Sequence, residues 1–496
     1  MYDAAIVGSG IAGMTAAIVL AKHGFRTVVV EQGPKTGGLM QPFQRGNCWF
    51  PTGVHCLGSL APGQILWRYF KYLGVLNRIR TVPMNQDNFL ECRFPGSTFQ
   101  LPYHHDAFRD KLLTLFPGER KTVEQYIADI RNTVARFSLY NLSAETERNP
   151  AEIQDSSLND YLKGLTSSRE LYAILTAINP FYAVPSDECP LYLHFLFMDS
   201  FLNSSWRIDE GYCSLAQAFE DSFKQAGGQV MCNSLVTRIE CTGGEVKGIR
   251  TANGDFIEAP RIIFAGHPKQ IPYLCADKAL RPVFRQRLAE AEETLGVFGI
   301  AMSWADSQCP MAQTDIIVYD SWDTDEHYHQ LLLSDKRLPR MLYFSGSPER
   351  TDGAYSVVGL STMPFSEVVI WNDTKTGRRP ESYNSAKCAL AERTLDAAKQ
   401  QWPSARTAAT IKASFTPLTF RDYTLTAQGS AYGFKKSINA MYTARIGSNT
   451  RVKGLFIAGQ SVVLPGLLGA LISSVNVCCE IFGRELLVSD IVRETQ

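Results

Sequence analysis

The chain opens with two short apolar runs separated by one helical stretch. Residues 2–7 (YDAAIV) and 25–30 (FRTVVV) are short and almost continuously apolar, which is typical of buried strands. Between them, residues 14–24 (MTAAIVLAKHG) are rich in alanine and leucine with a helical period, and Gly24 stands where a helix should end. The pattern predicts a strand, a helix and a second strand.

A second region with a similar alternation lies in the middle of the chain. Residues 216–228 (AQAFEDSFKQAGG) have the period of an amphipathic helix. Asn253-Gly254 lies between apolar runs and is a strong hairpin signal. We expect a further layer of strands over residues 229–240, 245–259 and 261–266.

The remaining segments differ from each other in pattern. Residues 121–137 (KTVEQYIADIRNTVARF) have a helical period, and we expect the insert that contains them, residues 61–199, to be helical. Apolar and polar positions alternate in a later insert, which predicts an antiparallel sheet. The alternating runs are residues 314–320, 339–346 and 354–362.

Composition and charge narrow the class of protein. The 49 Lys and Arg balance the 49 Asp and Glu, which argues against a sequence-independent nucleic-acid binder, because such a protein needs a basic surface. The 12 cysteines include no CxxC pair, and we expect no metal site. Scattered cysteines and a start without a basic signal region indicate a cytoplasmic protein with reduced thiols.

One apolar stretch near the end has the length of a membrane span. Residues 462–482 (VVLPGLLGALISSVNVCCEIF) follow a predicted strand, residues 453–460 (KGLFIAGQ). The stretch also contains Pro465, two glycines, two serines and Asn476. These residues favour a buried helix with a glycine-rich start over a membrane-spanning one.

The turn after the first strand carries the motif GSGIAG. Gly8 allows the tight turn, Gly10 lets a pyrophosphate approach the backbone, and Gly13 lets the helix pack against the strand. Glu31, at the tip of the second strand, can accept hydrogen bonds from a ribose. We therefore expect a dinucleotide to bind through Gly8, Gly10, Ile11, Ala12, Gly13, Glu31 and Gln32.

The loop after Glu31 favours FAD over NAD. Residues 32–39 (QGPKTGGL) contain a Gly-Gly pair that resembles the loop of FAD proteins, whereas NAD domains usually continue into another helix. The C-terminal helix would return to this sheet and direct its N-terminus at the flavin, where the helix dipole favours negative charge. Further expected FAD contacts are Gly37, Gly38, Leu39, Val236, Gly459, Gln460, Gly466, Gly469 and Ala470.

Together these segments resemble the superfamily of FAD proteins that contains phytoene desaturases, carotenoid isomerases and retinol saturases. The resemblance covers the N-terminal motif, the region around Gly211 and the C-terminal end, and it is weak over residues 275–405. Residues 51–58 (PTGVHCLG) and Gly459-Gln460 resemble the retinol saturase branch, although Pro51 stands where that branch has an acid. Residues 416–419, Tyr423 and residues 429–433 also resemble segments of this branch.

The resemblance implies a flavin enzyme that acts on carbon–carbon double bonds of a long conjugated or lipid-like chain. Reduction is the favoured reaction; desaturation, isomerisation and a non-catalytic role in binding flavin or lipid are the alternatives. Amine oxidation on the related fold is a further alternative, which the saturase-like motifs disfavour. No second GxGxxG motif occurs, so we expect electrons from a separate reductase or from docked NAD(P)H. The apolar substrate would be a small molecule or an acyl chain, and contact with a membrane surface is compatible with it.

His55 is the first candidate for the proton donor, because histidine titrates near neutral pH. Tyr423 and Tyr432 are the second candidates, and we expect His327 to lie at the surface in a polar loop. Two aromatic stretches fit either a core helix or the wall of a tunnel for a polyene. These stretches are residues 179–182 and 191–198.

The predicted fold class is α/β. It combines a Rossmann-like FAD-binding domain of the glutathione reductase type with an interleaved α+β substrate-binding domain. The FAD-binding domain would contain residues 1–60, 200–270 and 405–496. The substrate domain would contain a helical part, residues 61–199, and a sheet part, residues 271–404.

Overall fold

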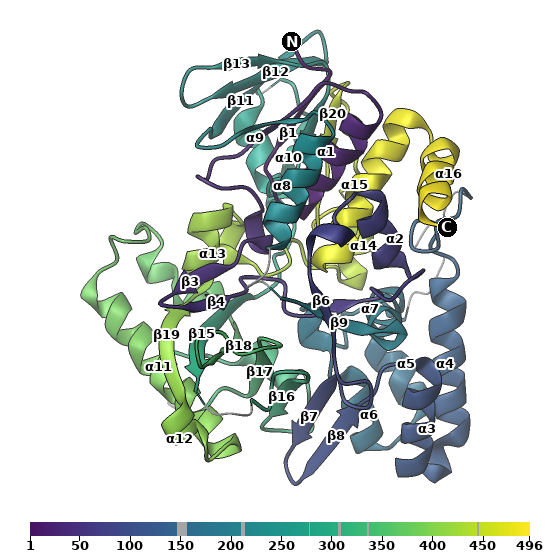
Figure 1. The fold of residues 1–496 in the computed structure, drawn as a ribbon, viewed down its shortest axis with the longest axis vertical. Coiled ribbons are helices and arrows are strands. Elements are labelled where there is room, and N and C mark those ends of the chain that lie inside the picture. The colour runs from purple at the N-terminus through teal and green to yellow at the C-terminus, as the bar shows by residue number, and fades with distance from the viewer. Residues whose placement is uncertain (146–155, 210–213, 277, 306–308, 335–336, 444–445) are drawn as a thin grey trace.

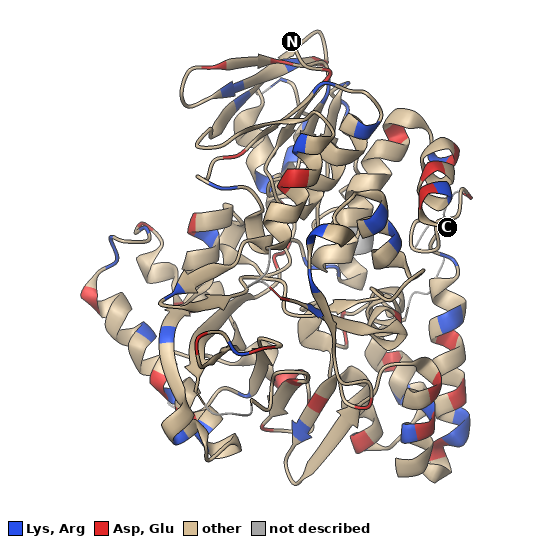
Figure 2. Cartoon of the chain, viewed as in Figure 1, with Lys and Arg blue, Asp and Glu red and all other residues tan. Residues whose placement is uncertain are grey.

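Two large sheets organise the chain in this computed structural model, a parallel one in the upper half of Figure 1 and a larger one in the lower half. Basic and acidic residues are mixed over both halves in Figure 2, in keeping with the zero net charge. The structure describes residues 1–145, 156–209, 214–276, 278–305, 309–334, 337–443 and 446–496. Gly211, which belongs to the resemblance to flavoproteins, lies outside these residues.

The first sheet is five-stranded and entirely parallel. The two strands predicted at the N-terminus are buried along their whole length, as their continuous apolar runs predicted. In spatial order the strands are β10 (Gln229–Met231), β2 (Thr27–Val30), β1 (Ala4–Val7), β14 (Ile262–Phe264) and β20 (Leu455–Ile457).

Different layers cover the two faces of this sheet. One face packs against α1 (Ile11–Lys22), α8 (Leu215–Gln225) and α15 (Gly466–Phe482). The other face packs against a small antiparallel sheet, β11 (Val236–Thr242), β12 (Glu245–Thr251) and β13 (Phe256–Glu258). The predicted extra layer is therefore confirmed for β11, β12 and β13, whereas β10 and β14, which were expected in it, belong to the parallel sheet.

The second sheet has seven strands, and all neighbours are antiparallel except the pair β16 and β7. The predicted antiparallel sheet is confirmed. In order the strands are β19 (Ala409–Phe415), β15 (Gly296–Trp304), β18 (Tyr355–Met363), β17 (Met341–Gly346), β16 (Asp315–Tyr319), β7 (Leu90–Phe94) and β8 (Ser97–Leu101). The short strands elsewhere are β3 (Phe43–Arg45), β4 (Cys48–Phe50), β5 (Leu57–Gly58), β6 (Thr81–Pro83) and β9 (Ser205–Ile208).

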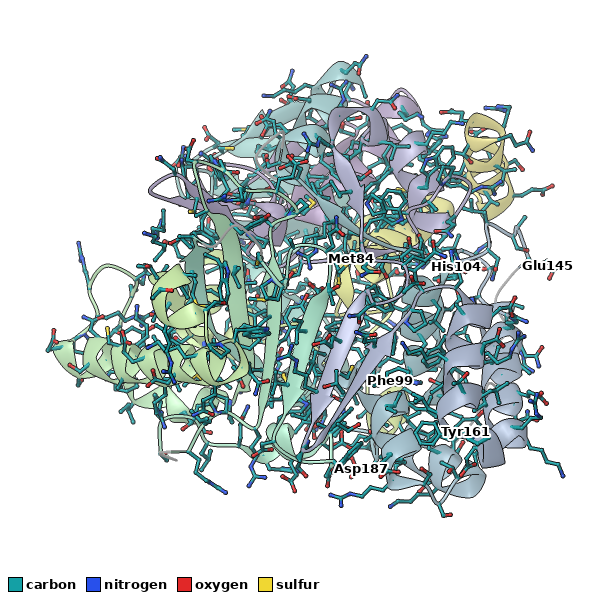
Figure 3. All side chains as sticks on the ribbon, turned by 60° about the horizontal axis from the view of Figure 1, so that its bottom comes forward. Met84, Phe99, His104, Glu145, Tyr161 and Asp187 are labelled. Atoms are coloured by element: carbon teal, nitrogen blue, oxygen red, sulfur yellow. The ribbon has the colours of Figure 1, made fainter. Side chains whose placement is uncertain are left out.

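Helices flank the second sheet on both sides. Figure 3 shows Phe99 at the border between the β7–β8 hairpin and the helices, where the Phe108 ring packs against it at 6.4 Å. The helices on that side are α3 (His105–Leu115), α4 (Arg120–Val134), α5 (Leu158–Leu165), α6 (Arg169–Thr176) and α7 (Leu191–Asn203). On the other side lie α11 (Glu381–Gln401), α12 (Ala405–Ala408) and α13 (Pro417–Thr424). The remaining helices lie in the upper half of Figure 1: α2 (Ile65–Tyr72), α9 (Ile271–Leu274), α10 (Pro282–Glu290), α14 (Ile438–Thr443) and α16 (Arg484–Thr495).

Three strands, the β7–β8 hairpin and β19, differ from the predicted division of the chain. The β7–β8 hairpin lies in the insert expected to be helical, and β19 lies in the C-terminal segment assigned to the FAD domain. Both join the seven-stranded sheet, because β7 pairs with β16 and β19 pairs with β15. The division into two interleaved domains stays a prediction with these two changes.

His327 was expected at the surface and is instead almost fully buried. Its Nδ1 lies 3.0 Å from Thr362 Oγ1 and its Nε2 lies 3.2 Å from Asn179 Oδ1. Burial lowers the pKa of His327 to about 3. Its polar neighbours Thr324 and Gln330 are buried as well, so a polar stretch of sequence did not mark the surface here.

Candidate active site and cofactor site

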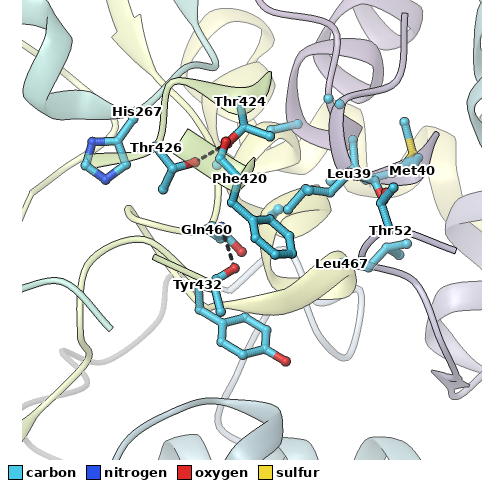
Figure 4. Close-up of a pocket in the computed structure, with 18 of the residues that line it drawn as sticks. Leu39, Met40, Thr52, His267, Phe420, Thr424, Thr426, Tyr432, Gln460 and Leu467 are labelled. Carbon is cyan, nitrogen blue, oxygen red and sulfur yellow. Dashed lines mark hydrogen bonds between the residues drawn. The ribbon is translucent and has the colours of Figure 1, made fainter. Parts of the chain in front are cut away.

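A cavity of about 410 Å³ lies between the two large sheets and is lined by both. It begins at the carboxyl ends of β1 and β2, where open parallel sheets bind ligands, and it reaches β15, β17 and β18. Figure 4 shows side chains from distant segments gathered around it, among them Thr52, Phe420, Tyr432 and Leu467.

The turn after β1 offers a site for a pyrophosphate. Gly8 has a φ of +95°, and a Cβ on Gly13 would lie 1.9 Å from the Gly8 carbonyl oxygen, so glycine alone lets α1 begin this close to the strand. A Cβ on Gly10 would meet no atom within 4 Å, so the backbone there borders open space. The first turn of α1 has neither a side-chain cap nor an acidic residue, which leaves its N–H groups available to a phosphate.

Ser9 links the glycine turn to Glu31. The Ser9 N–H and hydroxyl donate to one carboxylate oxygen of Glu31 at 3.0 and 2.5 Å, and the Gly33 N–H donates to the other at 2.8 Å. Ser9 Oγ also accepts a hydrogen bond from the Gly37 N–H at 3.0 Å. Ser9 thus joins the turn, the acid and the Gly-Gly loop, although nothing in the GxG pattern selects a serine at this position.

Most of the residues predicted to contact the cofactor line this cavity. Gly13, Gly37 and Gly469 lie behind its wall, where Gly37 packs against Ala216 and Gly469 against Leu464. The others contribute to the lining: Gly8, Gly10, Ile11, Ala12, Glu31, Gln32, Gly38, Leu39, Val236, Gly459, Gln460, Gly466 and Ala470.

The C-terminal strand and helix close the cavity from another side. The Gly459 N–H donates to Ser473 Oγ at 3.0 Å, and the Ser474 hydroxyl donates to the Ala12 carbonyl at 2.7 Å. These two serines are fully buried and explain the polar positions within residues 462–482. The prediction of a buried helix is confirmed; among the described residues, no helix is long and apolar enough to cross a membrane.

Beyond the glycine turn the cavity becomes a largely apolar chamber. Phe197 and Phe201 reach it from α7, and Phe181 reaches it from the short turn before that helix. Most of α7 is buried, so this aromatic stretch forms a core helix that also supplies residues to the chamber wall. Other apolar residues of the wall are Pro180, Ala183, Val297, Met341 and Leu360.

Two of the three predicted catalytic residues, His55 and Tyr432, line this chamber. The His55 ring lies 5.8 Å from the Tyr343 ring, and its Nδ1 has no hydrogen-bond partner among the described residues. Burial lowers the pKa of His55 to about 4, so its imidazole is neutral at pH 7. Burial raises the pKa of Tyr432, which keeps its hydroxyl protonated.

A buried charged cluster adjoins His55, and no sequence motif indicated it. Arg207 Nη2 lies 2.5 Å from Asp315 Oδ1, and the two side chains are only 3% and 1% exposed. The Tyr343 hydroxyl donates to the other Asp315 oxygen at 2.6 Å. Burial raises the pKa of both Tyr343 and Cys56, so the two residues face the chamber in their protonated forms.

Tyr423, the third predicted catalytic residue, lies at the rim of the cavity rather than inside the chamber. It is 68% exposed, and its carbonyl accepts a hydrogen bond from Gln32 Nε2 at 3.2 Å. A hydroxyl group in contact with water is poorly placed to deliver a proton into an apolar chamber. We therefore remove Tyr423 from the candidate catalytic residues.

A glycine turn at a helix N-terminus, an acid at the tip of the second strand and a returning C-terminal helix together define a dinucleotide-binding fold of the FAD type. The model of the flavin-containing amine oxidoreductase family matches residues 11–374, and the chain belongs to this family. FAD is therefore its cofactor, and the residues around the glycine turn fit it.

The chain is also similar to individual proteins of known name. The chain is 25% identical to an all-trans-retinol 13,14-reductase of Danio rerio, over 98% of this chain and 86% of the relative. It is 20% identical to prolycopene isomerase 1 of an Oncidium hybrid cultivar, over 93% of this chain and 80% of the relative. An oxidoreductase structure from Methanosarcina mazei shares the fold with a TM-score of 0.67 and 14% identity, over 96% of this chain and 99% of that one.

Proposed function

We propose that this FAD-dependent oxidoreductase reduces one carbon–carbon double bond of a long conjugated, lipid-like small molecule or acyl chain. The observation that carries the proposal is the chamber beside the glycine turn, whose wall is aromatic and aliphatic with few ionisable groups. The similarity to an all-trans-retinol 13,14-reductase along nearly the whole chain supports the same reaction class.

Reduced FAD, when bound, supplies a hydride to one alkene carbon. Phe181, Phe197 and Phe201 hold the conjugated chain by stacking and exclude water from the chamber. His55 delivers the proton that the second carbon requires, from a ring whose Nδ1 has no competing partner among the described residues. Tyr432 contributes to the orientation of the substrate beside it.

The pKa of about 4 for His55 predicts how the rate of this proton transfer depends on pH. At pH 7 roughly one His55 in a thousand carries the second proton. If this protonated form is the donor, the rate of proton transfer should rise about tenfold for each pH unit below 7 and level off near pH 4. A rate without this dependence would assign the proton to another group.

Electrons would reach the flavin from outside the chain. The sequence contains no second GxGxxG motif that would hold a nicotinamide cofactor permanently. We propose either a separate reductase or transient docking of NAD(P)H as the donor. Anaerobic mixing of the oxidised protein with NADPH or NADH distinguishes the two, because only direct docking bleaches the flavin without a reductase.

The test of the reaction uses pre-reduced protein under anaerobic conditions. A carotenoid, a retinoid and a polyunsaturated fatty acid are each added, and flavin reoxidation and product mass are followed. The expected result is reoxidation by at least one polyene together with a mass gain of two hydrogens. An unchanged mass for every polyene contradicts the proposed reduction.

Desaturation or isomerisation is the second candidate, because His55 is neutral at pH 7 and so has the protonation state that accepting a proton requires, although its lowered pKa makes it a weak base. The similarity to a prolycopene isomerase points the same way. Bleaching of the oxidised flavin by substrate would indicate desaturation, and a new isomer of unchanged mass would indicate isomerisation. No change in any of these measurements would leave a protein that only binds flavin or lipid.

We also propose that the protein is cytoplasmic and makes peripheral contact with a membrane from which an apolar substrate enters. Arg421 donates to the Asn372 carbonyl at 2.5 Å and so joins an exposed apolar loop to α13 at the cavity rim. Replacing Ile370 by Asp should reduce co-flotation with phosphatidylcholine vesicles, whereas Leu115→Asp on distant α3 should not; equal flotation of all three proteins would refute the contact. The exposed apolar side chains are Val369, Ile370, Tyr423 and Leu425.

A further inference from the structure

Residues 423–426, here called the strap, end α13 and lie along the rim of the cavity, which they line. The side chains of two glutamines on the opposite side of the cavity rim donate hydrogen bonds to the strap. Gln270 Nε2 donates to the Leu425 carbonyl at 2.9 Å, and Gln32 Nε2 donates to the Tyr423 carbonyl at 3.2 Å. Gln32 follows β2 and Gln270 follows β14, so both ties start from the sheet that carries the cofactor turn.

The two glutamine side chains also donate to carbonyl groups at the end of α13. The last carbonyl groups of a helix have no partner within the helix, and the two glutamine amides supply donors to carbonyls at this end. Leu425 and Gln428 have φ values of +55° and +54°, a left-handed conformation that costs non-glycine residues free energy. The strap is therefore held by its contacts rather than by its own backbone preference.

The base of the strap is anchored more firmly than the strap. Asp422 pairs with Arg379 at 2.6 Å, and both side chains are largely buried. Thr416 caps the start of α13 with a reciprocal capping box. The strap itself is tied across the cavity by two neutral hydrogen bonds, and Tyr423 and Leu425 are partly in solvent. Opening is thus easiest beyond Asp422, with α13 as a fixed base.

The ties attach beside the end of the cavity that would hold the adenosine part of FAD. Gln32 directly follows Glu31, and Gln270 lies one turn before Leu274, which lines the cavity as Val236 does. We propose that the strap is a cofactor latch, held closed by the amides of Gln32 and Gln270, and that its opening limits how fast FAD leaves. The inference rests on the FAD cofactor and not on the proposed substrate reaction.

The test measures FAD release directly, as the rise in flavin fluorescence after dilution of the holoprotein. Gln270→Leu removes one neutral hydrogen bond and should speed release about fivefold; the double variant Gln32→Leu/Gln270→Leu should speed it about twentyfold. Gln270→Glu keeps the size of the side chain but turns a donor into an acceptor that repels the Leu425 carbonyl. It should release FAD faster than Gln270→Leu, whereas a role in packing alone predicts wild-type behaviour.

Gln217→Glu is the matched control, because it makes the same change on the exposed face of α8, away from the cavity. Its FAD release should equal that of the wild type. Unfolding of the FAD-free variants should match FAD-free wild type. Should a variant fail to fold, hydrogen exchange of wild-type protein replaces it: removing FAD should speed exchange at Leu425 and Gly429.

Equal release rates for wild type, Gln270→Glu and the double variant would overturn the latch. So would strap amides that exchange equally with and without FAD. Neither measurement involves the polyene substrate, so failure of the latch is distinguishable from failure of the proposed reaction.

Discussion

The cofactor end and the substrate chamber of the same cavity are built in opposite ways. The cofactor end uses the backbone of consecutive residues, 8–13, with Glu31 at the tip of the adjacent strand. The chamber uses single side chains from segments far apart in the chain, such as His55, Phe197 and Tyr343. A backbone site requires glycine at fixed spacing and leaves a motif, whereas an apolar wall requires only suitable shape and leaves none.

The largest expected effect comes from disrupting the cofactor end, which is built from backbone. In Gly13→Val the new Cβ would lie 1.9 Å from the Gly8 carbonyl oxygen, so α1 and the turn must move apart. We expect the purified protein to lack flavin absorbance and to bind no added FAD. Gly118→Val is the control, because a Cβ there meets no atom within 4 Å. Normal FAD binding by Gly13→Val would show that the close approach is dispensable.

The next largest effect comes from altering the substrate chamber while leaving the cofactor end intact. His55→Phe keeps a ring of similar shape and removes the proposed proton donor. We expect turnover to fall about 10²- to 10⁴-fold, as for loss of a general acid, with FAD affinity unchanged. Tyr432→Phe should reduce turnover less. The measurement is single-turnover reoxidation of reduced flavin by a polyene; a rate equal to wild type would exclude His55 as the donor.

Variants of the buried charged cluster test whether the chamber depends on residues that are far apart in the sequence. Asp315→Ala leaves Arg207 charged and unpaired inside the protein, which should lower the free energy of unfolding by about 3–5 kcal/mol. The double variant Arg207→Met/Asp315→Leu removes both charges and should recover most of that loss. Urea denaturation measures both. A small effect of Asp315→Ala would mean that water already reaches the pair.

Acid acts on three buried histidines at once and distinguishes the two regions without mutation. Burial lowers the pKa values of His55, His194 and His327 from 6.5 to about 4, 3 and 3. The unfolded chain binds these protons more tightly, so their contribution to stability is complete above about pH 6.5. It is lost as the pH falls toward 4, by at most about 1.4 kcal/mol per pH unit for each histidine.

Hydrogen exchange at pH 5 and pH 7.5 checks this, after correction for the intrinsic exchange rates. Protection should fall more in α7, which carries His194, than in α1 beside the glycine turn. His327→Asn should lessen the pH dependence. Equal protection of α7 at the two pH values would contradict the neutral state of these histidines.

What the sequence predicted also differs between the cofactor end and the substrate chamber. The parallel strands, α1 and the cofactor turn were predictable, because short-range periodicity and glycine spacing specify them. Pro95-Gly96 is a turn signal that marks the β7–β8 hairpin locally, yet only the pairing of β7 with β16 assigns the hairpin to the second sheet. Arg207 and Asp315 are 108 residues apart in the chain, and neither belongs to a motif.

By itself, the sequence determined the cofactor class and the elements that position it, since a dinucleotide turn depends on atoms only a few residues apart. The tertiary structure alone decided which side chains meet in the chamber. It placed Tyr423 in solvent, His327 in the core and Asp315 beside Arg207. Burial and ion pairing depend on what the rest of the chain packs against a residue, and no local pattern carries that information.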